Sequence, residues 1–330
     1  MTDKLRIAVV GAGAIGGWLA ARLAARGHEV CALARGATLE ALNRDGLKLT
    51  ENGKETVSPI KASDQASDLG SQDLVLITVK GPAVPSIVDD ARTLMGKNTL
   101  LVSAMNGIPW WFSAAGLGDL DDDPIEAVDP GGSITERIPA ERVIGSVVHA
   151  ASGVEGPGHI RHKMGNELIF GEALGGTSNR LRDLGSVFVE AGFEVTCSRN
   201  IHADIWYKLW GNVTMNPISA ITSATCDRIL DDPLVNELVL QVMQEAKETG
   251  GKINCVIDES GEDRNLMTRK LGAFKTSMLQ DVEAGRPLEI DAILSAPCEI
   301  ARRVGIRAPA MEALLGLTRL FARSRGLYHA

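Results

Sequence analysis

The feature that most constrains the fold is a glycine-rich turn that follows a short apolar run, residues 7–10, and opens a helical pattern. The turn consists of Gly11, Ala12, Gly13, Ala14, Ile15 and Gly16. Because glycine has no Cβ atom, Gly11 permits a tight turn, Gly13 lets a pyrophosphate approach the backbone, and Gly16 lets the helix pack closely on the strand. The free N–H groups of the helix N-terminus attract the anion. These six positions therefore predict a dinucleotide-binding turn rather than a purely structural one.

Short apolar runs and helical patterns alternate through residues 1–198. The apolar runs have no polar face, as expected of strands in a parallel sheet that is covered on both sides. They span residues 5–10, 29–33, 73–79 and 99–104. The helical patterns between them span residues 15–26, 37–43 and 82–95. This alternation predicts βαβ units and a Rossmann-like, doubly wound α/β domain over residues 1–198.

The pattern changes in the second part of the chain. Residues 143–171 are rich in glycine and predict several short strands, followed by a helix over 179–191 and a last strand over 194–197. Beyond them, apolar residues recur at spacings of three and four, which predicts an all-helical domain over residues 199–330. Its expected helices span residues 201–222, 233–249, 263–284, 288–304 and 309–324.

Composition excludes several classes of protein. The net charge is −8 and no basic stripe is present, so we expect no nucleic-acid partner. Five scattered cysteines without a C-x-x-C pair favour reduced thiols and a cytoplasmic location. No stretch approaches the roughly 20 apolar residues that a bilayer-spanning helix needs. The acidic cluster at 119–123 lacks the spacing of a calcium loop, so we expect a solvated loop and no metal site.

Residues at three strand ends bear on the cofactor. NAD-binding folds usually place a carboxylate at the end of the second strand, where it accepts from the ribose 2′-OH. This chain has Arg35 there, and a guanidinium can pair with a 2′-phosphate, which favours NADP over NAD. Lys80 and Asn106 follow two further strands, where ligands bind in such sheets. Taken alone, Arg35 and Lys80 could equally be solvated, and Asn106 could be a turn residue.

A row of polar side chains lies within an apolar helical segment of the second domain. Lys208, Asn212 and Asn216 are four residues apart and share one helical face. Unpaired buried polar groups are costly, so this row either serves a function or forms an internal hydrogen-bond network. Ser277 and Glu289 form a second polar group, although a carboxylate in a helix first turn is also explained by the helix dipole.

Together, these segments resemble the ketopantoate reductase (2-dehydropantoate 2-reductase) family. The matching motifs, in family order, are Gly11–Gly16, Val79-Lys80, Asn106-Gly107, Lys208-Leu209-x-x-Asn212-x-x-x-Asn216-Pro217, Ser277-Met278-Leu279-Gln280-Asp281 and Glu289-Ile290-Asp291. The lysine–asparagine segment and the Ser-Met-Leu-Gln-Asp segment are specific, whereas many dehydrogenases share the glycine motif. The resemblance covers nearly the whole chain. It implies an NADPH-binding N-terminal domain, a helical C-terminal domain and a substrate cleft between them.

The resemblance implies reduction of 2-dehydropantoate to (R)-pantoate, a step of pantothenate biosynthesis, with NADP(H) as the cofactor. Lys208 would be the general acid that protonates the ketone oxygen as hydride arrives from C4 of the nicotinamide, and Glu289 would help to hold it. Implied substrate contacts are Asn106, Asn212, Asn216 and Ser277, and implied cofactor contacts are the glycine turn, Arg35, Lys80 and Asn106. The expected partner is a small 2-keto acid. A homodimer is the candidate assembly, and no membrane partner is expected.

Two alternatives stay open at this point. Phe274 stands where the family often has a polar residue, and the stretch 109–137 is longer than a minimal member needs. The first alternative is therefore a related NAD(P)-dependent 2-keto acid reductase or D-2-hydroxyacid dehydrogenase with a different substrate. The second is a non-catalytic NADP-binding sensor, because a fold can keep its nucleotide site without its chemistry. The presence of Lys208, Asn212 and Glu289 argues against the sensor.

Four of the five tryptophans form two pairs along the sequence. Trp206 and Trp210 bracket Lys208, and Trp110 and Trp111 follow the strand end at Asn106. We therefore expect the two pairs to mark two walls of the cleft, with their rings either touching the substrate or packing the helices.

Overall fold

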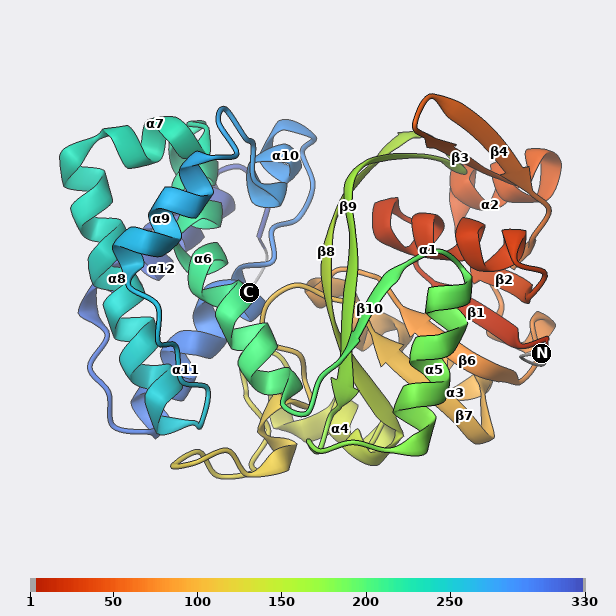
Figure 1. The fold of residues 1–330 in the computed structure, drawn as a ribbon, viewed down its shortest axis with the longest axis horizontal. Coiled ribbons are helices and arrows are strands. Elements are labelled where there is room, and N and C mark those ends of the chain that lie inside the picture. Colours follow the sequence, from red (N-terminus) through yellow and green to blue (C-terminus); the bar gives the residue numbers. More distant parts are fainter. Residues whose placement is uncertain (1–3, 329–330) are drawn as a thin grey trace. The chain divides into compact units, whose positions relative to one another are not determined.

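The chain forms two compact units in the computed structural model, which describes residues 4–328 (Figure 1). The first unit joins Met1–Met105 to Ile134–Ile201, and the second joins Asn106–Ser133 to His202–Ala330. The last crossing between the units thus falls close to the predicted boundary at residue 198. The segment Asn106–Ser133, placed in the first domain by the sequence pattern, packs within the second unit.

The first unit contains a mixed sheet that has ten strands within residues 4–328. Its strand order is β4-β3-β9-β8-β7-β6-β1-β2-β5, with β10 beside β9. The strands are β1 (Arg6–Val10), β2 (Glu29–Leu33), β3 (Leu47–Glu51), β4 (Lys54–Ser58), β5 (Lys61–Ser63), β6 (Gln72–Ile77), β7 (Met95–Ser103), β8 (Val143–Gly156), β9 (His159–Glu172) and β10 (Glu194–Cys197). Strands β2, β1, β6 and β7 pair in parallel. This core confirms the predicted Rossmann-like α/β architecture.

Two parts of the sheet differ from the sequence-based expectation. The region predicted as several short strands forms two antiparallel strands of 14 residues each, β8 and β9. Strands β3, β4 and β5, within residues 47–63, were not predicted, although an Asn-Gly pair marks the hairpin turn between β3 and β4. Asn52 and Gly53 have φ values of 51° and 75°. This is the backbone conformation for which Asn-Gly is preferred in two-residue hairpins.

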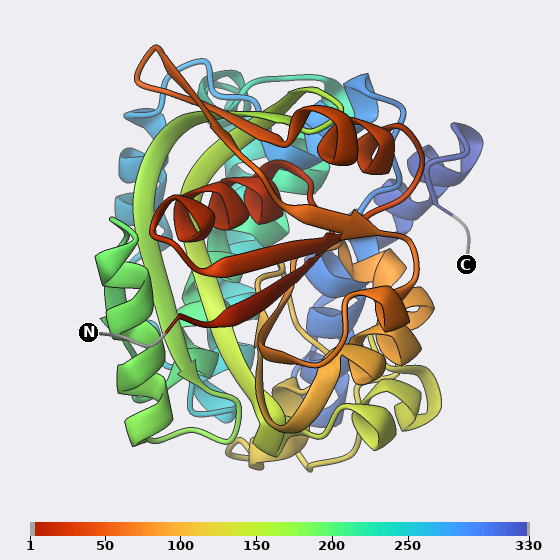
Figure 2. The same ribbon diagram turned by 90° about the vertical axis from the view of Figure 1, so that its right-hand side faces the viewer.

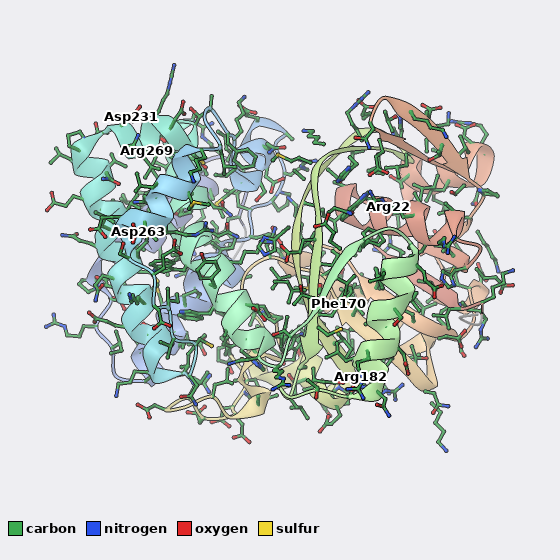
Figure 3. All side chains as sticks on the ribbon, viewed as in Figure 1. Arg22, Phe170, Arg182, Asp231, Asp263 and Arg269 are labelled. Atoms are coloured by element: carbon green, nitrogen blue, oxygen red, sulfur yellow. The ribbon has the colours of Figure 1, made fainter. Side chains whose placement is uncertain are left out.

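Five α-helices accompany this sheet within the described residues. They are α1 (Ala14–Ala25), α2 (Gly36–Asp45), α3 (Val88–Leu94), α4 (Ser133–Arg137), whose first residue lies at the junction of the units, and α5 (Asn179–Glu190). Helix α1 packs across the long strands β8 and β9 (Figure 2). A Cβ atom on Gly17 would lie 2.6 Å from Ile160 Cγ1, so glycine permits this close packing. Arg22, labelled in Figure 3, donates to Asn166 Oδ1 at 2.6 Å and ties α1 to the sheet.

The second unit is helical, as predicted, but its helices are more numerous than the five predicted stretches. Its α-helices are α6 (Ile201–Thr222), α7 (Cys226–Asp231), α8 (Pro233–Lys252), α9 (Gly261–Arg269), α10 (Ser277–Glu283), α11 (Ala296–Arg303) and α12 (Pro309–Ser324). The stretch predicted as one helix over 263–284 forms α9 and α10, because Gly272 takes a φ of 62° between them. Arg269 of α9 pairs with Asp231 of α7 (Figure 3).

The stretch predicted as a helix over 288–304 contains a widened turn. Asp291–Ser295 form the π-helix η6, and α11 follows directly. Pro297 explains the change, because it has no N–H to donate to the carbonyl of Ile293 and its ring would clash with that carbonyl in a regular α-helix. Widening the turn relieves this conflict.

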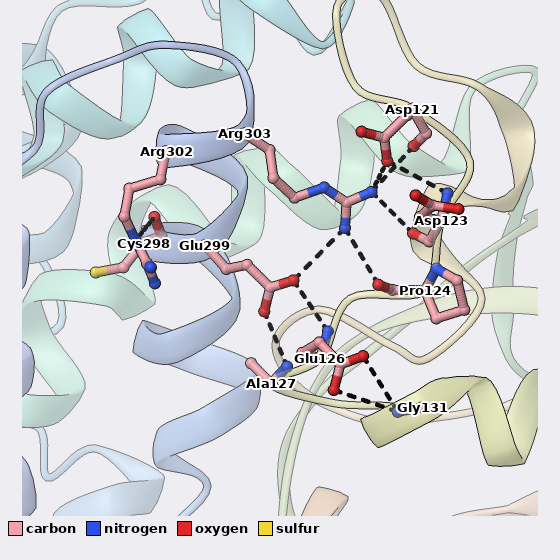
Figure 4. Close-up of polar contacts among 10 residues, drawn as sticks. All are labelled: Asp121, Asp123, Pro124, Glu126, Ala127, Gly131, Cys298, Glu299, Arg302 and Arg303. Carbon is pink, nitrogen blue, oxygen red and sulfur yellow. Dashed lines mark hydrogen bonds and ion pairs between the residues drawn. The ribbon is translucent and has the colours of Figure 1, made fainter.

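The excursion Asn106–Ser133 is fastened to α11 by two charged side chains (Figure 4). Arg303 pairs with the carboxylate of Asp121 and donates to the carbonyl of Asp123 at 2.9 Å. Glu299 accepts from two successive backbone N–H groups of the excursion, each at 2.9 Å. The acidic cluster is therefore not merely a solvated loop, because Asp121 helps to anchor the segment.

Three further observations concern membrane spans, metal sites and disulfides in the described residues. Among residues 4–328, no helix is long and apolar enough to cross a membrane. No group of three or more His, Cys, Asp or Glu side chains in the same range is arranged to hold a metal ion. The five cysteines, all within the described part of the chain, are free of disulfides.

Adjacent arginines on α11 test the importance of this anchor. Arg303→Ala should lower the free energy of unfolding by about 2–3 kcal/mol, because it leaves backbone carbonyls and a carboxylate without their charged donor. Arg302→Ala is the matched control, since the Arg302 side chain is 67% exposed while that of Arg303 is 18% exposed. The control should change stability by less than about 0.5 kcal/mol. Urea denaturation measures both, and equal losses would refute the assigned role of Arg303.

Candidate active site

The backbone of the glycine turn is closely packed at Gly11 and Gly16 and open at Gly13. Gly11 has a φ of +101°, which favours glycine. A Cβ atom on Gly16 would lie 2.2 Å from both the carbonyl oxygen of Gly11 and Thr78 Oγ1, whereas a Cβ atom on Gly13 would meet nothing within 4 Å. The open space therefore lies at Gly13, the N-cap of α1. These residues fit a pyrophosphate bound at a helix N-terminus.

Thr78 supports this turn and was missed by the sequence analysis. Its hydroxyl donates to the carbonyl of Gly11 at 2.7 Å from the end of β6. The available signal was a hydroxyl side chain directly after an apolar strand, next to the sheet edge where ligands bind.

Arg35 and Lys80 both belong to the first unit and both follow strands of the parallel core. Arg35 is the N-cap residue of α2, and its exposed guanidinium lies 3.3 Å from a carboxylate oxygen of Asp90. Lys80 is partly buried and precedes the 3-10 turn η2 (Gly81–Ile87). The end of β2 thus presents a cation where NAD-specific folds usually have a carboxylate.

The predicted polar row lies on α6, in the second unit. Lys208 donates to Oδ1 of Asn106 at 2.9 Å. Asn216 is buried, with 4% of its surface exposed, while Lys208 and Asn212 are partly buried. Asn106 belongs to the same unit as α6. The structure therefore brings Asn106 and Lys208 into direct contact within one unit.

The environment of Lys208 changes the pKa of its ammonium group. Burial lowers the pKa of its ammonium group to about 8, and the negative charge of Glu289 acts in the opposite direction. Glu289 is itself buried and lies two residues before the first residue of η6. A lysine with a pKa near neutrality is mostly protonated at pH 7 and yet can release its proton readily. This combination suits a general acid.

Ser277 and the residue before it have different surroundings. Ser277 is the first residue of α10 and is exposed. Thr276 is the buried N-cap, accepts from the N–H of Leu279 at 3.2 Å, and lies 2.5 Å from Ser219 Oγ of α6. Because Ser219 donates its hydroxyl proton to the carbonyl of Asn216, Thr276 donates to Ser219. Thr276, which was not predicted as a site residue, thereby links the start of α10 to the polar row.

The paired tryptophans pack the interior of the second unit. Trp206 and Trp210 donate from Nε1 to backbone carbonyls of α8 at 3.1 and 2.7 Å. Together with Trp110 and Trp111 they are at most 2% exposed. Of the two roles expected for these rings, the structure therefore shows the packing of helices. They stabilise the helix that carries Lys208.

A dinucleotide-binding turn in one unit and a desolvated lysine with an amide partner in the other define a class of protein. Such a protein is a dinucleotide-dependent oxidoreductase.

Comparison with known proteins identifies the family. The family model described as ketopantoate reductase PanE/ApbA matches residues 7–120, and its C-terminal counterpart matches residues 200–322. A 2-dehydropantoate 2-reductase from Mesorhizobium japonicum is 42% identical over 98% of this chain and 100% of its own length. The chain therefore belongs to the ketopantoate reductase family.

Solved structures agree with this membership. A protein from Ralstonia solanacearum MolK2, provisionally assigned as a ketopantoate reductase, is 51% identical, with a TM-score of 0.95 and coverage of 98% of this chain and 99% of its own. A 2-dehydropantoate 2-reductase from Methylococcus capsulatus is 26% identical, with a TM-score of 0.83 and coverage of 97% and 98%. A D-mandelate dehydrogenase with NADH and anilino(oxo)acetate, 21% identical with a TM-score of 0.83 and coverage of 98% and 100%, shares the fold.

Proposed function

We propose that this protein reduces 2-dehydropantoate to (R)-pantoate with NADPH, and that Lys208 is the general acid. The observation that carries the proposal is the environment of Lys208, whose ammonium group is desolvated and held by Asn106 beside the charge of Glu289. Reduction of a ketone develops negative charge on its oxygen, and a positioned cation with a transferable proton stabilises that charge. The 42% identical 2-dehydropantoate 2-reductase supports the same substrate.

The residues that would hold the cofactor fit NADPH. The open backbone at Gly13 and the N-terminus of α1 would receive the pyrophosphate, and Arg35 would pair with the 2′-phosphate. Lys80 and Asn106 would lie near the nicotinamide end. Bound NADPH supplies the hydride that reduces the 2-keto carbon. The chain's own task is then to orient the keto acid and to deliver a proton to its oxygen.

The remaining polar residues are assigned to the substrate. Glu289 would hold Lys208 and the substrate hydroxyl, and Asn212, Asn216 and Ser277 would bind polar groups of the keto acid. The hydroxyl chain through Thr276 supports this set, because it fixes the start of α10 against α6. The homodimer and the cytoplasmic location stay predictions.

Phe274 favours a second candidate substrate. Its carbonyl accepts from the N–H of Cys226 at 3.0 Å, so its backbone is fixed three residues before Ser277. A ring at this position offers apolar contact instead of a hydrogen bond, which suits a 2-keto acid with a bulkier apolar side chain. A shared fold does not decide between the two substrates.

Oxidation of NADPH against a panel of 2-keto acids tests the proposal. Ketopantoate should give the highest kcat/KM, and straight-chain and aryl 2-keto acids should be at least about tenfold poorer, because a missing polar contact costs discrimination. Absorbance at the nicotinamide band follows the reaction. A higher kcat/KM with an aryl 2-keto acid would replace ketopantoate by the second candidate, and no turnover with any keto acid would refute reductase activity.

The proton donor is tested by mutation and pH. Lys208→Ala should lower kcat by about 10²–10⁴-fold while NADPH affinity persists, because a general acid contributes to the chemical step. In the unmodified enzyme, kcat/KM for reduction should fall as the pH rises through about 8, where the Lys208 ammonium group loses its proton. Lys270→Ala, an exposed lysine of the same unit, is the control and should behave as the unmodified enzyme. A kcat/KM that stays flat from pH 7 to pH 10 would contradict this role.

The 2′-phosphate contact is tested by a matched pair of arginines. Arg35→Ala should raise the Kd for NADPH by about 10–100-fold and leave the Kd for NADH within about threefold, because one charge-assisted contact is lost. Arg44→Ala serves as the control, since Arg44 lies on α2 with an exposed side chain and an acidic neighbour, as Arg35 does. Fluorescence titration gives both constants. Equal losses for the two nucleotides would remove Arg35 from the 2′-phosphate site.

A further inference from the structure

The loop after β7 is seated on the π-helix η6. In this helix the N–H of Ala296 donates to the carbonyl of Asp291, five residues earlier. In a regular α-helix the same N–H would donate to the carbonyl of Ala292. Here the Ala292 carbonyl accepts the N–H of Ile108 at 2.8 Å. The widened turn thus makes a backbone acceptor available to a segment distant in the sequence.

Gly107 makes this contact sterically possible. Its φ is +75°, and a Cβ atom on it would lie 2.4 Å from the carbonyl oxygen of Ala292. The neighbouring atoms are the carbonyl group and the Cβ atom of Ala292 in a buried helical turn, so they cannot move aside as the end of a flexible side chain would. Both the conformation and the close approach therefore require glycine.

The contact joins the two segments that supply polar groups to Lys208. Asn106, whose Oδ1 accepts from Lys208, directly precedes Gly107. Glu289, whose charge acts on Lys208, lies three residues before Ala292. Any change in how the loop sits on η6 would therefore move the amide relative to the carboxylate.

We propose that Gly107 and the π-helix η6 are positioning elements that hold the carboxamide of Asn106 and the carboxylate of Glu289 in fixed register around the Lys208 ammonium. Pro297 maintains the π-helix, because it excludes the regular hydrogen bond to Ile293. The inference rests on the proposed role of Lys208 as the proton donor. It assigns a positioning function to the backbone at Gly107 and η6, in addition to the roles proposed for side chains.

A matched pair of glycine variants tests the contact. Gly107→Ala should lower kcat by about tenfold or more, because small displacements of catalytic groups have large effects on rate. It should also move the alkaline limb of the kcat/KM profile to lower pH, since the ammonium loses an acceptor that favours its charged form. Gly116→Ala is the control, because Gly116 has a φ of +62° in the same segment and a Cβ atom there would meet nothing. The control should keep both kcat and the limb.

The variant Pro297→Ala distinguishes an effect on the position of the polar groups from an effect of lost stability. Alanine supplies the missing N–H and permits a regular turn, in which Ala296 competes with Ile108 for the carbonyl of Ala292. The limb should again shift to lower pH, while the Tm should be unchanged or higher because alanine is favoured inside a helix. A Pro297→Ala enzyme with the limb of the unmodified enzyme would overturn the proposal.

A measurement without substrate keeps this inference separate from the proposed function. The rate of acetylation of Lys208 by acetic anhydride across pH, read by peptide mass spectrometry, follows the fraction of free amine. The midpoint should move to lower pH in Gly107→Ala and Pro297→Ala and stay in place in Gly116→Ala. If the unmodified enzyme fails to reduce ketopantoate but these shifts appear, the substrate is wrong and the positioning stands. An unchanged midpoint in either test variant refutes the positioning, whatever the activity.

Discussion

The packing of the second unit around α6 has to compensate one lysine ammonium group that is partly withdrawn from water. Removing a cation from water is costly unless acceptors or opposite charges compensate. Lys208 obtains an amide oxygen from Asn106 and the field of Glu289, and its pKa still falls to about 8. Helix α6 can carry such a group because its tryptophans anchor it firmly to α8. The elements around Lys208 are therefore arranged to compensate one desolvated charge.

Local patterns predicted the parts of the fold that depend on local physics. The glycine turn at residues 11–16 follows β1 and includes the start of α1 as expected, because its steric requirements are met by six consecutive residues. Likewise, the spacing of Lys208, Asn212 and Asn216 placed them on one helix. The family resemblance placed Lys208 and Asn106 in the same site, but it did not predict the hydrogen bond between them. Its geometry spans 102 positions of the chain.

Features that depend on distant partners escaped the sequence analysis. Nothing local in residues 106–133 distinguishes a loop of the sheet unit from an excursion into the helical unit, since the decisive partners are Arg303 and Glu299. The π-helix depends on Pro297 within an otherwise helical pattern, and a proline alone does not say whether a helix ends, kinks or widens. Strand β3 is a different case, because the Asn52-Gly53 turn is a local signal from which the β3–β4 hairpin could have been predicted.

The structure places Asn106 in a different unit from the one that the sequence pattern predicts. The sequence placed Asn106 at a strand end of the nucleotide-binding domain, where it would face the cofactor. In the structure it clusters with the helical unit, so that Lys208, its amide partner and Glu289 all belong to one compact body. The groups that surround Lys208, the proposed proton donor, are therefore held together by the packing of a single unit. The glycine turn and Arg35, which we propose as cofactor contacts, belong to the other unit.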